Sequence, residues 1–343
     1  MRLRRTSPAI PALASIIAML AMPDRLAAAP GAANDWRFSV DTAARSVWNE
    51  TLGGDAQAYF LGLDVHRVFS DERGDIGTLT LQPYLTRLVD MPMYPPFFDG
   101  PNDTELVFRI FNFNLTRYGG GRSNVRIGHF EIPFGLEQVV NTNGTLHDYI
   151  HGPNLGVKAD WGLGVNGDLP RFEYEAAITR GSGNEWENLG SPYIVAARIG
   201  TPRDAAFAVG LSVFDGRVFD RSQSDFTTRR RRVGVDAIWT GPRIGLQAEL
   251  SAGKDEALKV RAALIELDLD ARDGMWRGFL QTRWLRREDP GTGANNDSLG
   301  LGLGIRVAPD NHWSIDLQLD RNLRQPVGMP LATMLSAQLR YRT

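Results

Sequence analysis

The chain has 343 residues, of which 43% are hydrophobic, and it contains no cysteine. The lack of cysteine excludes disulfides, thiolate metal sites and a cysteine nucleophile. The 38 basic residues nearly balance the 40 acidic ones, which argues against a general nucleic-acid-binding protein. Three of the basic residues are lysines, so arginine supplies almost all of the positive charge.

The first 33 residues have the pattern of a secretory signal peptide. Basic residues at the start precede an apolar run from Ala9 to Met22, and a small-residue stretch follows. This run is shorter than the roughly 20 apolar residues that a helix needs to cross a bilayer. We expect cleavage after Ala33, with residues 34–343 forming a single exported domain.

After the leader, apolar and polar residues alternate along most of the chain, which is the pattern of β-strands. No apolar run there reaches 18 residues, so the sequence offers no transmembrane helix. The clearest alternation is in 154–163, where one face carries Leu155, Val157, Ala159, Trp161 and Leu163. Sixteen strands are predicted, at 36–46, 58–69, 76–88, 104–117, 123–131, 154–163, 170–180, 193–201, 204–214, 230–240, 242–253, 257–270, 275–286, 297–307, 311–321 and 331–342. Four of them (36–46, 104–117, 193–201 and 257–270) alternate less cleanly.

The predicted connections alternate between short and long. The short ones are rich in turn residues, at 71–75, 118–122, 164–170, 201–203, 241, 271–274 and 308–310. The others are longer, at 47–57, 89–103, 132–153, 181–192, 215–229, 287–296 and 322–330, apart from a short one at 254–256. Brief periplasmic turns and extended outer loops are typical of a single-chain outer-membrane barrel.

The alternation fits a membrane barrel with apolar residues toward lipid, and it fits a soluble barrel with polar residues outside equally well. Two features favour the membrane barrel. Large aromatics lie near strand ends on the apolar faces, as in interfacial girdles: Trp161, Phe172, Tyr193, Phe207, Trp239, Trp276, Trp313 and Tyr341. The polar faces combine charges with many glycines, which suits a water-filled lumen. We therefore predict an all-β fold, a transmembrane antiparallel barrel of about 16 strands.

The connection 132–153, the third outer loop, is the longest and is unusually apolar for a surface loop. Such a loop is expected to fold into the lumen and narrow it, with Glu137, His147, Asp148 and His151 at the constriction. The alternative is a loop that packs over the barrel mouth without touching the path. His147 and His151 are four residues apart, but no helix is indicated, because Gly152 and Pro153 end the segment. Polar loop histidines are therefore favoured over a metal site.

Charged residues of lumen-facing parity come from the predicted barrel wall. The basic ones are Lys158, Arg171, Arg232, Arg243, Arg277, Arg306 and Arg340, and the acidic ones are Asp160, Glu173, Glu175, Asp236, Glu249 and Asp316. Rings of charged side chains set pore selectivity, and this mixture predicts a strong transverse field with modest net preference. The dense basic run at 229–232 is expected at the outer end of a strand, where it could attract anions or bind lipopolysaccharide phosphates.

Residues 126–138, RIGHFEIPFGLEQ, resemble the phosphate-selective porin O/P family of Gram-negative outer membranes. The shared stretch is Gly128, His129, Phe130, Pro133, Phe134, Gly135 and Glu137, leading from a strand into the inward-folded loop. The resemblance implies a passive, usually trimeric channel without a cofactor. The family's pore has a lysine ladder and an arginine ladder. Three lysines cannot form the former, which argues against phosphate specificity. The C-terminus also departs from the usual final aromatic residue, since Arg342 and Thr343 follow Tyr341.

The leading hypothesis is an outer-membrane porin, not an enzyme, that lets small hydrophilic solutes or ions diffuse passively, with a weak anion preference. Its expected partners are membrane lipid, lipopolysaccharide and two further copies of the chain in a homotrimer. Three alternatives remain open at this point. They are a barrel sheath around a partner such as a periplasmic cytochrome, a membrane-embedded hydrolase using His147 and His151, and a soluble exported β protein.

Overall fold

The computed structural model describes residues 36–50, 54–91, 94, 98–119, 122–140, 144–220, 226–271, 274–325 and 332–343. The expected leader and its cleavage site after Ala33 lie outside these residues. None of the described helices is long and apolar enough to cross a membrane.

The described residues form sixteen strands and one short helix. The strands are β1 (Arg37–Asn49), β2 (Gly54–Asp71), β3 (Gly74–Val89), β4 (Thr104–Leu115), β5 (Asn124–Glu131), β6 (Ala159–Leu169), β7 (Phe172–Thr179), β8 (Tyr193–Gly200), β9 (Phe207–Phe219), β10 (Thr227–Thr240), β11 (Ile244–Asp255), β12 (Leu258–Ala271), β13 (Trp276–Glu288), β14 (Asn295–Val307), β15 (Trp313–Arg324) and β16 (Thr333–Arg342). The helix, α2, spans His151–Leu155.

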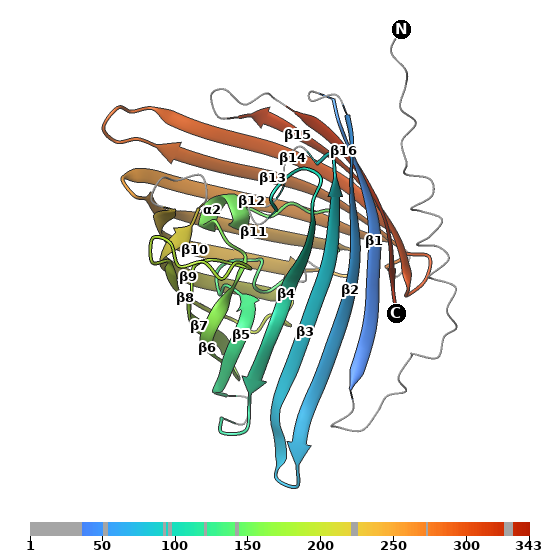
Figure 1. Ribbon diagram of the computed structural model, residues 1–343, viewed down its shortest axis with the longest axis vertical. Coiled ribbons are helices and arrows are strands. Elements are labelled where there is room, and N and C mark those ends of the chain that lie inside the picture. Colours follow the sequence, from blue (N-terminus) through green and yellow to red (C-terminus); the bar gives the residue numbers. More distant parts are fainter. Residues whose placement is uncertain are drawn as a thin grey trace. The chain divides into compact units, whose positions relative to one another are not determined.

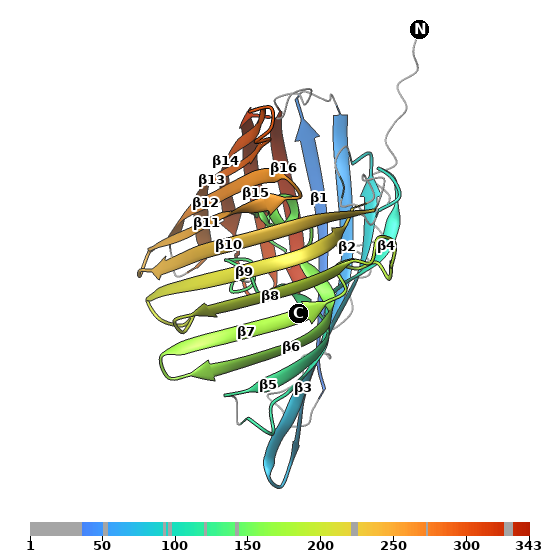
Figure 2. The same ribbon diagram turned by 90° about the vertical axis from the view of Figure 1, so that its left-hand side faces the viewer.

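Each strand pairs antiparallel with its neighbours in sequence, and β1 pairs with β16, so the sheet closes into a barrel (Figures 1 and 2). Closure leaves no unpaired sheet edge, which is what allows strands to cross a hydrocarbon layer. We call the end with the tight turns β2–β3, β6–β7 and β10–β11 the short-turn end. The opposite end, where the connection 132–158 begins and ends, is the long-loop end.

The two faces of the barrel differ sharply in polarity. On β15 the side chains of Ile315, Leu317 and Leu319 are exposed, whereas the alternating Asp316 and Asp320 are buried inside. A soluble barrel would have the opposite arrangement, with polar residues outside. The predicted fold, a sixteen-stranded membrane-spanning antiparallel barrel, is therefore confirmed.

None of the eight aromatics expected in girdles is buried. Six of them (Phe172, Phe207, Trp239, Trp276, Trp313 and Tyr341) lie within two residues of a strand terminus at the short-turn end. Aromatic rings close to the ends of membrane-spanning strands are typical of the boundary between lipid and water.

All sixteen predicted segments correspond to strands, but the sixth is displaced. The prediction placed it at 154–163 with Leu155 and Val157 on the lipid-facing side, and this was wrong. Leu155 lies in α2 and Val157 in the following turn, and both are buried inside the barrel. The helix ends because Gly156 adopts a left-handed φ of +87°, and β6 then runs on to Leu169, through most of the predicted turn 164–170.

Several outer connections are shorter than predicted, because strand pairing continues into them. The connection expected at 47–57 is 50–53, since β1 and β2 stay paired as far as Asn49 and Gly54. Likewise β9 and β10 pair up to Phe219 and Thr227, which shortens the loop expected at 215–229. The connection 132–158 remains the longest.

Candidate functional site

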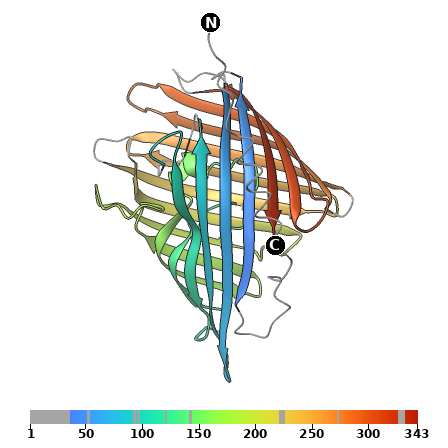
Figure 3. The ribbon, with the colours of Figure 1, turned by 45° about the vertical axis from the view of Figure 1, so that its right-hand side comes forward.

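The segment 132–150, which we call the inner loop, packs on two sections of the barrel wall. Ile132 and Phe134 belong to one apolar cluster with residues of β8 and β9, namely Ile194, Ala196, Phe214 and Val218. Leu136 and Ile150 belong to a second cluster with residues of β12 and β13, namely Val260, Ala262, Leu264 and Leu285. Helix α2, which follows directly, is drawn within the ring of strands in Figures 1 and 3.

The Pro-Phe-Gly turn at the start of the inner loop has a physical explanation. Phe134 is fully buried and lies over Gly234 of β10, where an added Cβ would come within 2.7 Å of the phenyl ring. Gly135 has a left-handed φ of +56°, and a Cβ there would lie 2.1 Å from the Glu249 carboxylate. Glycine is therefore required at 135 both by the backbone conformation and by the close approach of the wall.

Glu249 of β11 holds the inner loop from two directions. Its Oε2 accepts a hydrogen bond of 2.8 Å from the backbone N–H of Leu136 and lies 3.1 Å from Nε2 of His151. The other ring nitrogen of His151, Nδ1, lies 2.8 Å from Oε2 of Glu137. The imidazole is thus clamped between two carboxylates, and all three side chains are buried.

The electrostatics of this clamp favour a charged imidazolium. Burial opposes the charge on His151, but the carboxylates of Glu249 and Glu137 outweigh it and raise its pKa to about 10. Burial likewise opposes the charge on Glu137, but His151 outweighs it and holds the pKa of this carboxyl below its usual value. Because a buried charge is stable only when it is paired, the clamp fastens the end of the inner loop to the wall.

The second half of the inner loop is attached to β12 and β13 and also to β16 and β1. Asp148 forms a 2.5 Å ion pair with Arg283 of β13. Nδ1 of His147 lies 3.0 Å from Glu266 of β12. The carbonyl oxygens of Gly144 and Thr145 accept hydrogen bonds from Gln338 and Arg45 on β16 and β1. Three of the predicted loop residues, His147, Asp148 and His151, therefore contact inward-facing side chains of the wall, and Glu137 contacts His151.

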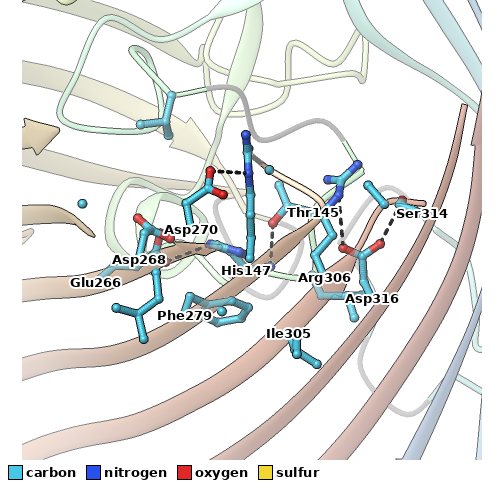
Figure 4. Close-up of a pocket in the computed structure, with 18 of the residues that line it drawn as sticks. Thr145, His147, Glu266, Asp268, Asp270, Phe279, Ile305, Arg306, Ser314 and Asp316 are labelled. Carbon is cyan, nitrogen blue, oxygen red and sulfur yellow. Dashed lines mark hydrogen bonds and ion pairs between the residues drawn. The ribbon is translucent and has the colours of Figure 1, made fainter. Parts of the chain in front are cut away.

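A cavity of about 800 Å³, which we call the main cavity, lies between the inner loop and the short-turn end. Five of the predicted wall residues line it: Arg243, Arg277, Arg306, Arg340 and Asp316. Figure 4 shows His147 close to Glu266 and Asp268 on one side of this cavity, with Arg306 and Asp316 on the other.

A second cavity, of about 690 Å³, lies at the short-turn end beside β4–β8. Glu173 and Glu175, both predicted, line it together with Gln138 of the inner loop. Glu175 accepts a 2.7 Å hydrogen bond from Gln138 and forms a 2.6 Å ion pair with Arg126. The polar residues of this cavity therefore also hold the loop.

Six predicted wall residues line neither of these two cavities. Asp236 is buried and bound by Arg198 at 2.7 Å, and Glu249 belongs to the clamp. Arg232 is buried and bonds to Asp255 at 2.5 Å and to the carbonyl oxygen of Asn154 in α2.

Asp160, near the start of β6, is also buried. Its carboxylate accepts backbone N–H bonds from Trp161 and Gly183. Lys158 follows α2, its ammonium 3.9 Å from Glu131, and Arg171 is exposed in the turn between β6 and β7.

Sequence reasoning missed several inward-facing charges that take part in this network, namely Arg45, Arg126, Arg198, Arg283, Glu266 and Asp268. Arg45, Arg198, Glu266 and Asp268 lie in three of the four segments whose alternation is least regular. Arg126 is the first residue of the stretch 126–138 that resembles a porin family. Its place in that stretch was the sequence signal that could have identified it.

Comparison with known proteins identifies the fold. No family model and no curated protein matches the sequence. Among solved structures, the outer-membrane-expressed OmpT of Vibrio cholerae superposes with a TM-score of 0.66 over 92% of this chain and 99% of its own, at 11% identity. The fold is that of an outer-membrane barrel.

Two further structures agree. OprB of Pseudomonas putida has a TM-score of 0.66 at 10% identity, covering 90% of this chain and 94% of its own. An anion-selective porin from Comamonas acidovorans has a TM-score of 0.61 at 10% identity, covering 90% of this chain and all of its own. At this level of identity the likeness concerns the fold, and function is argued separately.

Proposed function

We propose that this protein is a porin of a Gram-negative outer membrane through which small hydrophilic solutes and ions diffuse passively. The observation that carries the proposal is the closed barrel with an apolar outside and charged, cavity-bearing inside. Sixteen strands enclose more space than side chains fill. The structural likeness to a protein described as an anion-selective porin supports the same conclusion.

The inner loop sets the narrowest part of the path in this proposal. Its contacts extend from Glu175 of β7 to Arg45 of β1, so it is held on both sides of the lumen. Solutes then pass between the loop and the remaining wall, through the main cavity. Glu137 and His151 fasten the loop, whereas His147 and Asp148 are partly exposed and can meet solutes.

Charge selectivity is expected to be weak. The main cavity carries five arginines (Arg243, Arg277, Arg306, Arg340 and Arg342) and five carboxylates (Glu266, Asp268, Asp270, Asp310 and Asp316). Opposed rows of charge orient a solute without strongly excluding either sign. Any anion preference is therefore small. The resemblance of residues 126–138 to the phosphate-selective porin family is not taken to imply phosphate specificity.

Planar-bilayer recordings of the purified barrel test the proposal. We expect open channels whose reversal potential in a salt gradient lies near zero and shifts toward cation preference in Arg306→Gln. Arg261→Gln is the matched control, because Arg261 is exposed on the outer face of β12 and does not line the main cavity. Folded protein that produces no channels would overturn the proposal.

The alternatives are less well supported. A sheath would copurify with a partner and conduct only after its removal. A hydrolase would need a histidine free to accept a proton from a nucleophile. Both ring nitrogens of His151 contact carboxylates, so neither is free for that role. His147→Ala tests the remaining histidine and should leave any measured hydrolysis unchanged. We further propose that the chain forms a homotrimer, which crosslinking tests, and that residues 229–232 contact lipopolysaccharide, which lipid-binding assays test. Export by a cleaved leader is also proposed, and N-terminal sequencing of the mature protein tests it.

A further inference from the structure

His147 of the inner loop meets two carboxylates of β12 at the wall of the main cavity (Figure 4). Glu266 and Asp268 are two residues apart, so both side chains point inward. One ligand atom from each of the three residues lies within 4.8 Å of the other two. The imidazole also packs on Phe279, with ring centroids 3.7 Å apart, which limits its motion.

This cluster differs in charge balance from the inward-facing carboxylates that are paired with arginine. Asp236 and Asp320 are each paired with a guanidinium, Arg198 and Arg283 respectively. In the described part of the chain, the one ion-pair partner of Glu266 is His147, and Asp268 has none. Within ion-pair distance the two neighbouring carboxylates therefore share one imidazole, and Arg277 acts on Asp268 only from farther away, so the site is short of positive charge.

The surroundings suit a cation. Amide nitrogens of Gln281 and Gln247 donate to Glu266 at 2.6 Å and to Asp268 at 3.1 Å. Such outer-shell hydrogen bonds hold ligands in position. Both carboxylate side chains and the imidazole line the main cavity, which offers an ion a path of entry and room for a water ligand.

We propose that His147, Glu266 and Asp268 bind a zinc-type divalent transition-metal ion. Imidazole nitrogen and carboxylate oxygen are both zinc ligands, and three protein ligands with water as the fourth complete a tetrahedral site. Calcium and magnesium are disfavoured, because they prefer oxygen ligands and higher coordination numbers. Zinc bonds of about 2.0–2.2 Å require the ligand atoms to draw together, which side chains lining a cavity can do by rotating.

Binding would join the inner loop to β12 by a metal bridge and place positive charge beside the acidic side of the main cavity. The site follows from side-chain geometry alone, so it does not depend on whether the barrel conducts. A bound ion should also hinder cation entry into the main cavity.

Equilibrium dialysis of the purified full-length barrel against Zn²⁺, with excess Ca²⁺ to fill oxygen-only clusters, tests the proposal. We expect the wild-type barrel to bind one Zn²⁺ per chain. In His147→Ala and in Asp268→Asn this binding should be lost, or its affinity should fall at least about tenfold. His312→Ala is the matched control, because His312 lines the same cavity but lies beside the carbonyl oxygen of Arg342. This control should bind zinc normally.

Co²⁺ supplies a second readout, since tetrahedral coordination gives intense visible absorption that a hydrated surface ion lacks. Heat-dependent gel migration confirms that each variant is folded. The proposal fails if the wild-type barrel binds no Zn²⁺, or if folded His147→Ala and Asp268→Asn both bind it as the wild type does.

Discussion

His151→Gln tests whether the buried imidazolium fastens the inner loop. Removing one partner of a buried ion pair costs about 3–5 kcal/mol, because the remaining charge stays buried without compensation. The loop is also held by the buried apolar side chains of Ile132, Phe134, Leu136 and Ile150. At about 1.5–3 kcal/mol each, they contribute more than the clamp loses. The loop should therefore stay in place but open locally far more often.

Hydrogen–deuterium exchange measures this opening directly. The amides of Gly135, Leu136, Val139 and Val140 donate hydrogen bonds to Ser212, Glu249 and the carbonyl oxygen of Leu136. Their exchange should accelerate by about two to four orders of magnitude in His151→Gln, since about 1.4 kcal/mol corresponds to a factor of ten. Amides of β15 serve as the internal reference.

The matched control replaces all three members of the clamp with glutamine (Glu137→Gln, His151→Gln, Glu249→Gln). Neutral groups of similar shape leave no buried charge uncompensated, so protection should recover substantially. Wild-type exchange in the single variant would refute the reasoning. So would a triple variant no better protected than the single one.

Three further predictions concern the same loop. Gly135→Ala should reduce the free energy of loop attachment by more than about 1–3 kcal/mol, which is the cost of left-handed backbone strain alone. Gly183→Ala is the control, since it shares a positive φ, +65°, but its nearest contact would be at 3.5 Å. Phe134→Ala should raise loop exchange by the equivalent of about 3–5 kcal/mol, whereas Phe207→Ala, on the exposed outer face, should leave it unchanged. Loop protection, corrected for intrinsic exchange, should be greatest between pH 4.5 and 6.5. These are the ordinary pKa values of Glu137 and His151. Above 6.5 the raised pKa of His151 makes the stabilisation decline, until it is lost near its folded pKa of about 10. Below 4.5 the lowered pKa of Glu137 makes the stabilisation decline as that carboxyl is protonated. A flat profile would contradict this account of the clamp.

The barrel could be predicted from sequence because its pattern is local. A residue's parity along a strand decides whether it meets lipid or lumen, so alternation indicated sixteen strands and misplaced one of them. The sixth strand was misplaced because Leu155 and Val157 continue the alternation by chance. They are apolar because they pack inside against Ile194 and Phe214, and a two-residue period cannot distinguish that cluster from lipid.

The candidate site could be predicted only in part, because it depends on pairings between distant segments. His151 and Glu249 are 98 residues apart, and nothing local to either residue indicates their contact. The helix of His151 was missed because Gly152 and Pro153 suggested a break. A proline in the first turn of a helix loses no hydrogen bond, however, since its missing N–H would have had no partner there.

Exposure divides the inward-facing charges into two kinds with separate roles. Pairs such as Arg198 with Asp236 are almost fully buried, so dissolved ions scarcely screen them and they act on the fold. Arg277 and Arg306 are 64% and 37% exposed on their side chains, and at physiological salt their fields are screened within about 8 Å. Raising the salt concentration should therefore remove the ion selectivity of the proposed pore while leaving the inner loop attached. Loss of both together would mean that the loop is held by charges exposed to the cavity, contrary to the buried clamp of Glu137, His151 and Glu249.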